Sequence, residues 1–268
     1  MSDRKENFSV GPRPRLELRL VTGDVSVLPG QAGAIEVVVR GGKPEQVIIE
    51  QIGDTVVVRQ EAGRWTSGSL DITVHAPAGL DVEASLASTD LAIEVDVTDL
   101  QANLASGDLR ARGVRRDTSI KCASGDVEID EVGGKLRVTS ASGDVTVGVI
   151  GGDAVCSTAS GDVVVGLARG DLAAKSASGD LTIDEYWGSD LRGKTVSGDM
   201  RVGLARGQRA DVDLQSLSGN LRLPSRPALD DSGGKPAARI SFKSVSGDFE
   251  LVETANPSAQ LESPKRTD

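Results

Sequence analysis

Aspartate recurs at a fixed spacing in this chain and is the residue type whose arrangement could most readily do chemistry. It ends a Ser-Gly-Asp triplet, and five of these triplets follow one another at intervals of 18 residues, at Ser106, Ser124, Ser142, Ser160 and Ser178. The triplet returns at Ser197 and Ser246, and degenerate copies begin at Ser88 and Ser218. The aspartate column consists of Asp90, Asp108, Asp126, Asp144, Asp162, Asp180, Asp199 and Asp248, with Asn220 in the degenerate copy.

Two interpretations of this column compete. In the first, the Ser and Asp side chains bond to backbone N–H groups of a repeated turn, and Gly supplies a positive φ. In the second, the carboxylates bind calcium, as in a calcium-dependent β-roll built from nine-residue units. The roll motif Gly-Gly-x-Gly-x-Asp contains glycines that Ser-Ala-Ser-Gly-Asp lacks. We therefore favour the turn interpretation, which Asn220 also fits, and expect neither a metal nor a cofactor.

The elements that must position these turns are short strands. The unit from Ser142 divides into two nine-residue halves, each with a turn followed by alternating apolar and polar residues. Across successive units the apolar positions form columns, for example Leu109, Val127, Val145 and Val163. Alternation that repeats in register indicates an inward and an outward face. The sequence predicts an all-β fold: a β-solenoid (β-helix) of 18-residue coils with two short strands per coil. The alternative is a meander of antiparallel hairpins.

The same patterns divide the chain into segments. Residues 1–15 are predicted to be a disordered tail, and residues 16–80 an N-terminal strand and hairpin segment that caps the solenoid. The solenoid repeats cover residues 81–252, with an insertion loop at 224–239 rich in Pro, Gly and Asp. Phe242 and Phe249 are expected to help close the C-terminal end, and residues 253–268 are predicted to be a second disordered tail.

Three stretches carry a family resemblance. They are the Ser-Gly-Asp-Val-x-Val repeats, the strand Leu70–Val74 with its Ala-Pro-Ala-Gly turn, and the following Leu-Asp-Val-Glu-Ala at residues 80–84. Over residues 16–252 the chain resembles the bacterial DUF4097-type β-strand-repeat proteins, also labelled "putative adhesin". The resemblance implies a β-helical fold and carries over no catalytic residue.

Composition restricts the possible partners and compartments. The formal net charge is −10, which disfavours nucleic acid and anionic lipid as partners of the average surface. The chain has no apolar run of the length that a transmembrane helix needs, and no signal peptide is recognised at its start. We therefore expect a cytoplasmic protein that could reach a membrane only through a partner. Cys122 and Cys156 are expected to be buried thiols rather than a disulfide.

No catalytic constellation stands out. His75, the only histidine, adjoins a turn and lacks a nucleophile motif, so a Ser-His-Asp triad is not expected. Aromatic residues are scarce, and Tyr186 and Trp187, beside a one-residue insertion, form the best candidate contact patch. The sequence favours a non-enzymatic structural or interaction module, an acidic scaffold or adhesin-like surface that binds an unknown protein or itself. The alternatives are a carbohydrate-binding or polysaccharide-cleaving β-helix and the calcium-dependent β-roll.

Overall fold

The computed structural model describes residues 3–60, 70–205, 209–223 and 238–254. Apart from one short 3-10 helix (Pro44–Gln46), these residues form β-strands joined by tight turns. The strands are β1 (Arg4–Ser9), β2 (Arg15–Pro29), β3 (Ala34–Gly41), β4 (Val47–Ile52), β5 (Thr55–Gln60), β6 (Leu70–Ala76), β7 (Asp81–Ile93), β8 (Leu100–Ser106), β9 (Leu109–Val114), β10 (Thr118–Ser124), β11 (Val127–Val132), β12 (Leu136–Ser142), β13 (Val145–Ile150), β14 (Ala154–Ser160), β15 (Val163–Ala168), β16 (Leu172–Lys175), β17 (Leu181–Tyr186), β18 (Asp190–Lys194), β19 (Met200–Ala205), β20 (Ala210–Ser218), β21 (Leu221–Arg222), β22 (Ala238–Ser246) and β23 (Phe249–Thr254).

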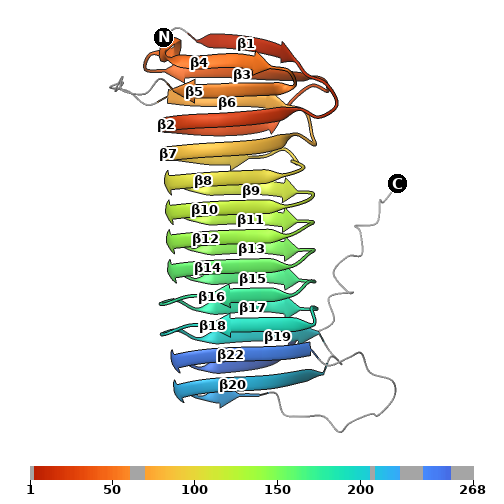
Figure 1. The fold of residues 1–268 in the computed structure, drawn as a ribbon, viewed down its shortest axis with the longest axis vertical. Helices are drawn as coiled ribbons and strands as arrows, with labels where there is room; N and C mark the ends of the chain where they lie inside the picture. The colour runs from red at the N-terminus through yellow and green to blue at the C-terminus, as the bar shows by residue number, and fades with distance from the viewer. Residues whose placement is uncertain (1–2, 61–69, 206–208, 224–237, 255–268) are drawn as a thin grey trace, which may run out of the picture.

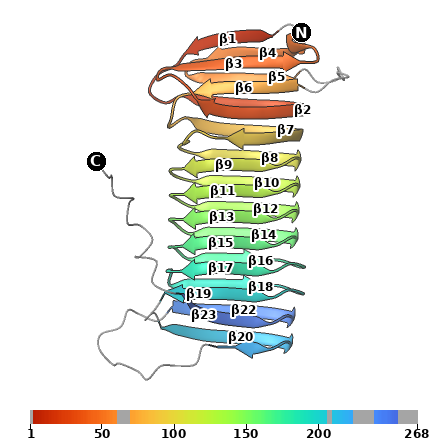
Figure 2. The same ribbon diagram turned by 180° about the vertical axis from the view of Figure 1, so that it is seen from behind.

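The strands stack into an elongated β-solenoid with two faces (Figure 1). From β8 onward each strand pairs in parallel with the strand one coil away, so that β8, β10, β12, β14, β16 and β18 form one face. The odd-numbered strands from β9 to β19 form the other face, visible from behind in Figure 2. Parallel pairing in register confirms the predicted solenoid and excludes the antiparallel meander.

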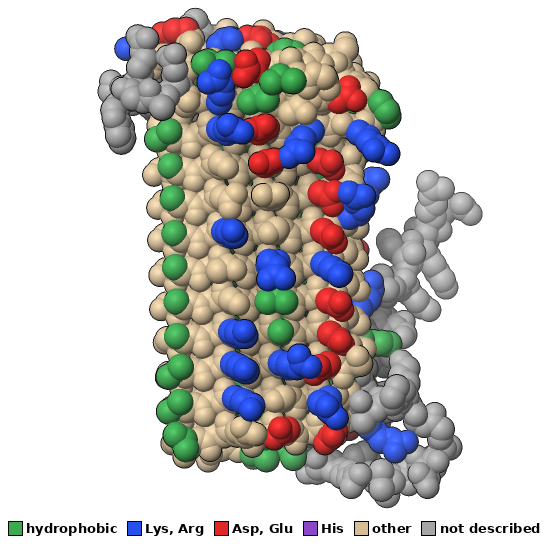
Figure 3. All heavy atoms as spheres, in the orientation of Figure 1, with side chains coloured by type: hydrophobic (Ala, Val, Ile, Leu, Met, Phe, Trp, Pro, Cys, Tyr) green, Lys and Arg blue, Asp and Glu red, His purple; other side chains and the backbone are tan. Residues whose placement is uncertain are grey.

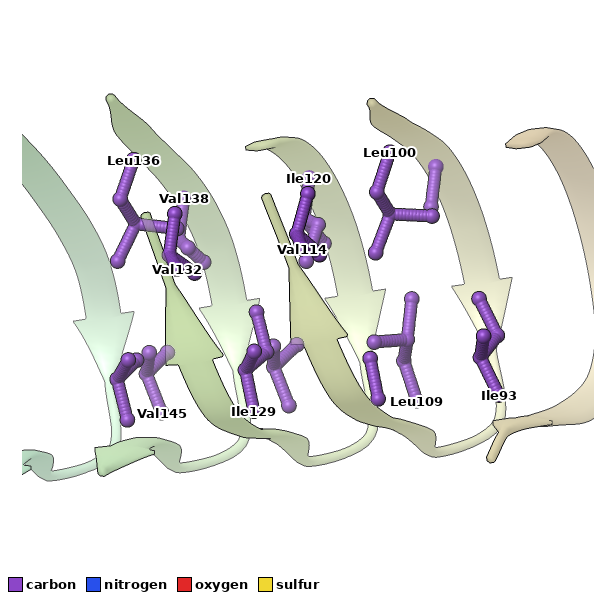
Figure 4. Packing of buried hydrophobic residues seen from close by; sticks show 14 of the residues in the cluster. Ile93, Leu100, Leu109, Val114, Ile120, Ile129, Val132, Leu136, Val138 and Val145 are labelled. Atoms are coloured by element: carbon purple, nitrogen blue, oxygen red, sulfur yellow. The ribbon is translucent and has the colours of Figure 1, made fainter. Parts of the chain in front are cut away.

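The core is a thin layer of aliphatic side chains between the two faces. Leu100, Ile120 and Leu136 project from one face toward Leu109, Ile129 and Val145 of the other (Figure 4). All six are at most 2% exposed. No single coil has enough apolar surface for a core of its own, so each coil depends on its stacked neighbours.

At the N-terminal end, chain order and spatial order differ. The long strand β2 lies between β7 and the β5/β6 pair, although β5 and β6 come later in the sequence. Antiparallel strands complete this end, with β4 on β5, β3 on β6 and β1 on β3. Strands β1 to β6 thus form this end of the stack. The prediction of a disordered tail is wrong for Arg4–Ser9, which pair with β3 along their whole length.

The C-terminal end shows a second change of order. β22 pairs with β18 on one side and β20 on the other, and β23 likewise lies between β19 and β21. The coil that comes last in the sequence, β22 and β23, is therefore the second-to-last coil of the stack. In Figure 1 it lies below β18 and above β20. Phe242 and Phe249, whose ring centroids lie 5.8 Å apart, pack inside this inserted coil, so the prediction that they close the end is wrong.

The end position belongs instead to the coil of β20 and β21. Its apolar side chains have no further coil to cover them within the described residues, and Leu221 and Leu223 are 53% and 52% exposed. The predicted insertion at 224–239 lies outside the described residues except for Ala238 and Arg239, which begin β22. The predicted tail at 253–268 likewise lies outside them from residue 255 onward, whereas Glu253 and Thr254 end β23.

Candidate functional site on the corners and faces of the solenoid

The aspartate column forms a hydrogen-bonded ladder along one corner. The Oδ1 atom of each aspartate accepts a hydrogen bond from the backbone N–H of the aspartate one coil further on, at 2.7–2.9 Å, for Asp90, Asp108, Asp126, Asp144, Asp162, Asp180 and Asp199. Asp248 bonds in the same way to Asn220. The side chains therefore connect successive coils rather than close their own turn.

A second ladder runs along the opposite corner, and sequence reasoning missed it. Oδ1 of Asp99, Asp117 and Asp153 accepts from the backbone N–H one coil further on. Asp171 accepts from the backbone N–H groups of Ser189 and Asp190, and from the Ser189 hydroxyl at 2.8 Å. The Ser189 bonds, chiefly that of its side chain, hold the pKa of Asp171 below its usual range, and Arg116 does the same for Asp99. The aspartates in the second nine-residue half were the available signal.

The prediction that Tyr186 and Trp187 form an exposed contact patch is wrong for Tyr186. Tyr186 is fully buried, because it continues the inward column of Val132, Ile150 and Ala168 at 18-residue spacing. Its hydroxyl has no hydrogen-bond partner of good geometry among the described residues, although the backbone amide of Asp190 lies close, and burial raises its pKa. Trp187 points outward, is 42% exposed and donates its indole N–H to Glu185.

The remaining reactive side chains are dispersed. Cys122 and Cys156 are both buried and free, as predicted, and burial raises the pKa of the Cys156 thiol to about 12. His75 on β6 lies opposite Glu36 on β3 in the N-terminal cap. Within the described ranges, no three His, Cys, Asp or Glu side chains form a cluster that could hold a metal.

The even-numbered face carries a charge pattern that the sequence alone did not reveal. In the two central outward columns of β10, β12, β14, β16, β18 and β22, six of the twelve side chains are Lys or Arg and none is Asp or Glu. We call these six the basic strip: Lys121, Arg137, Lys175, Arg192, Lys194 and Lys243. At the edge of this face Asp190 on β18 lies beside Arg239 on β22. Figure 3 shows the strip, with Lys and Arg side chains gathered along the middle of the face.

The basic strip contains an in-register column of like charge. Lys175 lies beside Lys194, and Lys194 beside Lys243, on adjacent strands. Arg192 forms an ion pair with Asp190, whereas no described residue forms a salt bridge with the other five members of the strip. Like charges spaced about 4.8 Å apart repel by about 1 kcal/mol in water. This column therefore does not stabilise the fold.

The odd-numbered face differs. It carries both signs of charge, and cross-strand ion pairs join Arg110 to Glu128 and Arg201 to Glu250. A shallow groove of about 700 Å³ runs along the second-ladder corner between Arg15 and Asp153 and reaches Arg137 of the basic strip, and no aromatic side chain lines it. Stacked sugar rings would have no aromatic platform there. The segregated charge makes the basic strip the stronger candidate for binding.

The parallel coils and hydrogen-bonded corners define a β-solenoid repeat protein. The chain belongs to the family described as Toastrack DUF4097, whose sequence model matches residues 16–190 and, in an overlapping match, 152–252. This confirms the resemblance seen in the sequence. A comparison with the curated proteins gives no match.

Solved structures share the fold at low identity. A "putative lipid binding protein" from Parabacteroides distasonis is 11% identical with a TM-score of 0.52, over 94% of this chain and 97% of the other. A "putative adhesin" from Bacteroides fragilis is 13% identical with a TM-score of 0.47, over 93% and 97%. These names describe adhesion and binding proteins rather than enzymes. Of the residues described here, none forms a helix long and apolar enough to cross a membrane.

Proposed function

We propose that this protein is a non-enzymatic interaction module, a rigid β-solenoid that serves as a scaffold or adhesin-like binding surface. The observation that supports this most directly is the basic strip on a chain of net charge −10. Unpaired lysines in register carry a repulsive cost that a bound anionic partner removes. The two aspartate ladders hold the coils in register, so the strip is presented as a preorganised surface. A structural neighbour with a TM-score of 0.52 is named as a putative binding protein, which is consistent with such a role.

Retention on a cation-exchange resin tests whether the strip acts as a binding face. A protein of this net charge is expected to pass through a sulfonate resin at pH 7 unless a local basic surface holds it. We expect retention at low ionic strength and elution by moderate salt, because exposed charges are screened over about 10 Å at 0.1 M.

Matched variants complete this test. The triple variant Lys175→Gln/Lys194→Gln/Lys243→Gln should lose retention. The control Arg110→Gln/Arg112→Gln/Arg201→Gln removes the same charge from the odd-numbered face and should be retained like the wild type. Equal behaviour of the two variants, or passage of the wild type through the resin, would contradict the proposal.

A further inference from the structure

The shape and surroundings of the basic strip restrict what can bind it. Its two outward columns are two residues apart along each strand, about 7 Å, and its six strands span about 24 Å along the solenoid axis. One long side is bounded by the corner of the second aspartate ladder, where the carboxylates of Asp117, Asp153, Asp171 and Asp190 outnumber the cations of Lys135 and Arg239. On the other side an apolar row that includes Ala123, Ala141 and Ala159 separates the strip from the Ser-Gly-Asp corner. The strip is thus long and narrow, with the Ser-Gly-Asp corner beyond one side and a corner of mostly carboxylate side chains along the other.

Three kinds of anionic partner fit this shape poorly. A flat anionic membrane would meet the four carboxylates of the second-ladder corner as well as the strip itself. Single-stranded nucleic acid is usually held by aromatic side chains on which bases stack, and the strip has none. A peptide could not add as a strand here, because each strand of the strip already has a neighbour on both sides.

A thin linear polyanion remains. We propose that the basic strip binds an inorganic polyphosphate chain laid along the solenoid axis; this inference rests on the proposed binding function. Phosphate oxygens accept charge-assisted hydrogen bonds from Lys and Arg. A chain with charge on every unit can follow the lysine column without a base or a sugar ring to accommodate. Lys175, Lys194 and Lys243 would form the main contact at the β22 end of the strip, and Lys121 and Arg137 would extend it beyond β14, which has no Lys or Arg.

Titration with polyphosphates of defined length, followed by calorimetry at several salt concentrations, tests the proposal. Affinity should rise with chain length until the chain spans the strip and then level off, and orthophosphate should bind at least about 100-fold more weakly. Replacing Lys175, Lys194 and Lys243 by Gln should reduce the slope of log K against log salt by about 2, by analogy with single-stranded polyanions. The Arg110/Arg112/Arg201 control variant should leave that slope unchanged.

The outcomes distinguish the proposal of polyphosphate binding from the more general proposal that the basic strip is a binding face. Poly-aspartate, an oligodeoxythymidine strand or vesicles with anionic lipid binding as tightly as polyphosphate would overturn the polyphosphate assignment. The absence of polyphosphate binding in a protein that the cation-exchange resin still retains would also overturn it, while the binding face would stand. If the wild-type protein neither bound polyphosphate nor was retained by the resin, the proposal that the basic strip is a binding face would be refuted. Unchanged circular-dichroism melts would show that the variants remain folded, as expected for exposed side chains.

Discussion

At the scale of single residues, the aspartate of each Ser-Gly-Asp triplet connects its coil to the two neighbouring coils, through its Oδ1 atom on one side and its backbone amide on the other. Asp144 accepts the amide of Asp162 at 2.8 Å, and its own amide donates to Asp126. Gly143 precedes it with φ of +118°, and its α-carbon passes so close to the previous coil that a Cβ would lie 2.1 Å from the carbonyl oxygen of Gly125. Glycine is therefore required for close stacking as well as for its backbone angle.

Two alanine substitutions separate these two requirements. Gly143→Ala should destabilise the protein by at least about 3 kcal/mol, since the strained angle and the backbone clash add together. Gly53 also has a positive φ, +61°, but open space surrounds its missing Cβ. Gly53→Ala should therefore cost only about 1 kcal/mol. Urea unfolding measures both, and similar losses for the two variants would contradict the close-stacking argument.

At the scale of elements, the order of the last coils decides which strand is the edge. β20 pairs only with β22 among the described strands, and its inward side chains Val212 and Leu214 are only half-buried. In β22 the inward side chains Ile240 and Phe242 are almost fully buried. Strands with few buried contacts and one free edge open first in the native state.

Hydrogen exchange can verify this order directly. Backbone amides of β20 should exchange much faster than those of β22, although β22 lies nearer the C-terminus of the chain. The amides of β12, in the middle of the solenoid, serve as the protected reference. If the coils followed sequence order, β22 and β23 would form the edge and exchange fastest, and that result would refute the inserted coil.

At the scale of the whole molecule, the charges are sorted by location. Carboxylates whose Oδ1 atoms accept backbone amides predominate at the two corners, and Lys and Arg side chains occupy the middle of the even-numbered face. In the Ser-Gly-Asp column every carboxylate from Asp90 to Asp248 thus has a structural partner. Calcium is not needed to explain their repetition.

Melting the protein with and without EDTA tests the calcium alternative. We expect the melting temperature to change by less than about 2 °C, which for a chain of this size corresponds to less than about 1 kcal/mol. Addition of calcium to the EDTA-treated protein serves as the control. A large loss of β-structure in EDTA, restored by calcium, would show that the second carboxylate oxygens of the ladder hold cations.

The 18-residue period alone was enough to predict the solenoid and the inward columns. Leu109, Val127 and Val145 are buried as expected, because a repeat that alternates in register can bury its apolar side only by stacking. The same period also predicts that Tyr186 is buried, because it lies 18 residues after the inward-facing Ala168. We instead expected a contact surface there because the residue is aromatic. The strand at Arg4–Ser9 was missed because its alternation is weak and its stability comes from pairing with β3.

The sequence by itself determined which residues face inward, where the turns lie and that the coils repeat, since these follow from local spacing. Only the tertiary structure decided which coil lies beside which. Counted along the chain, the neighbour of Lys194 would be Gln215; in the folded protein it is Lys243, because β22 is inserted between β18 and β20. The pair Lys175 and Lys194 follows from chain order, whereas the extension of the lysine column to Lys243 arises from this non-local pairing, which no local pattern encodes.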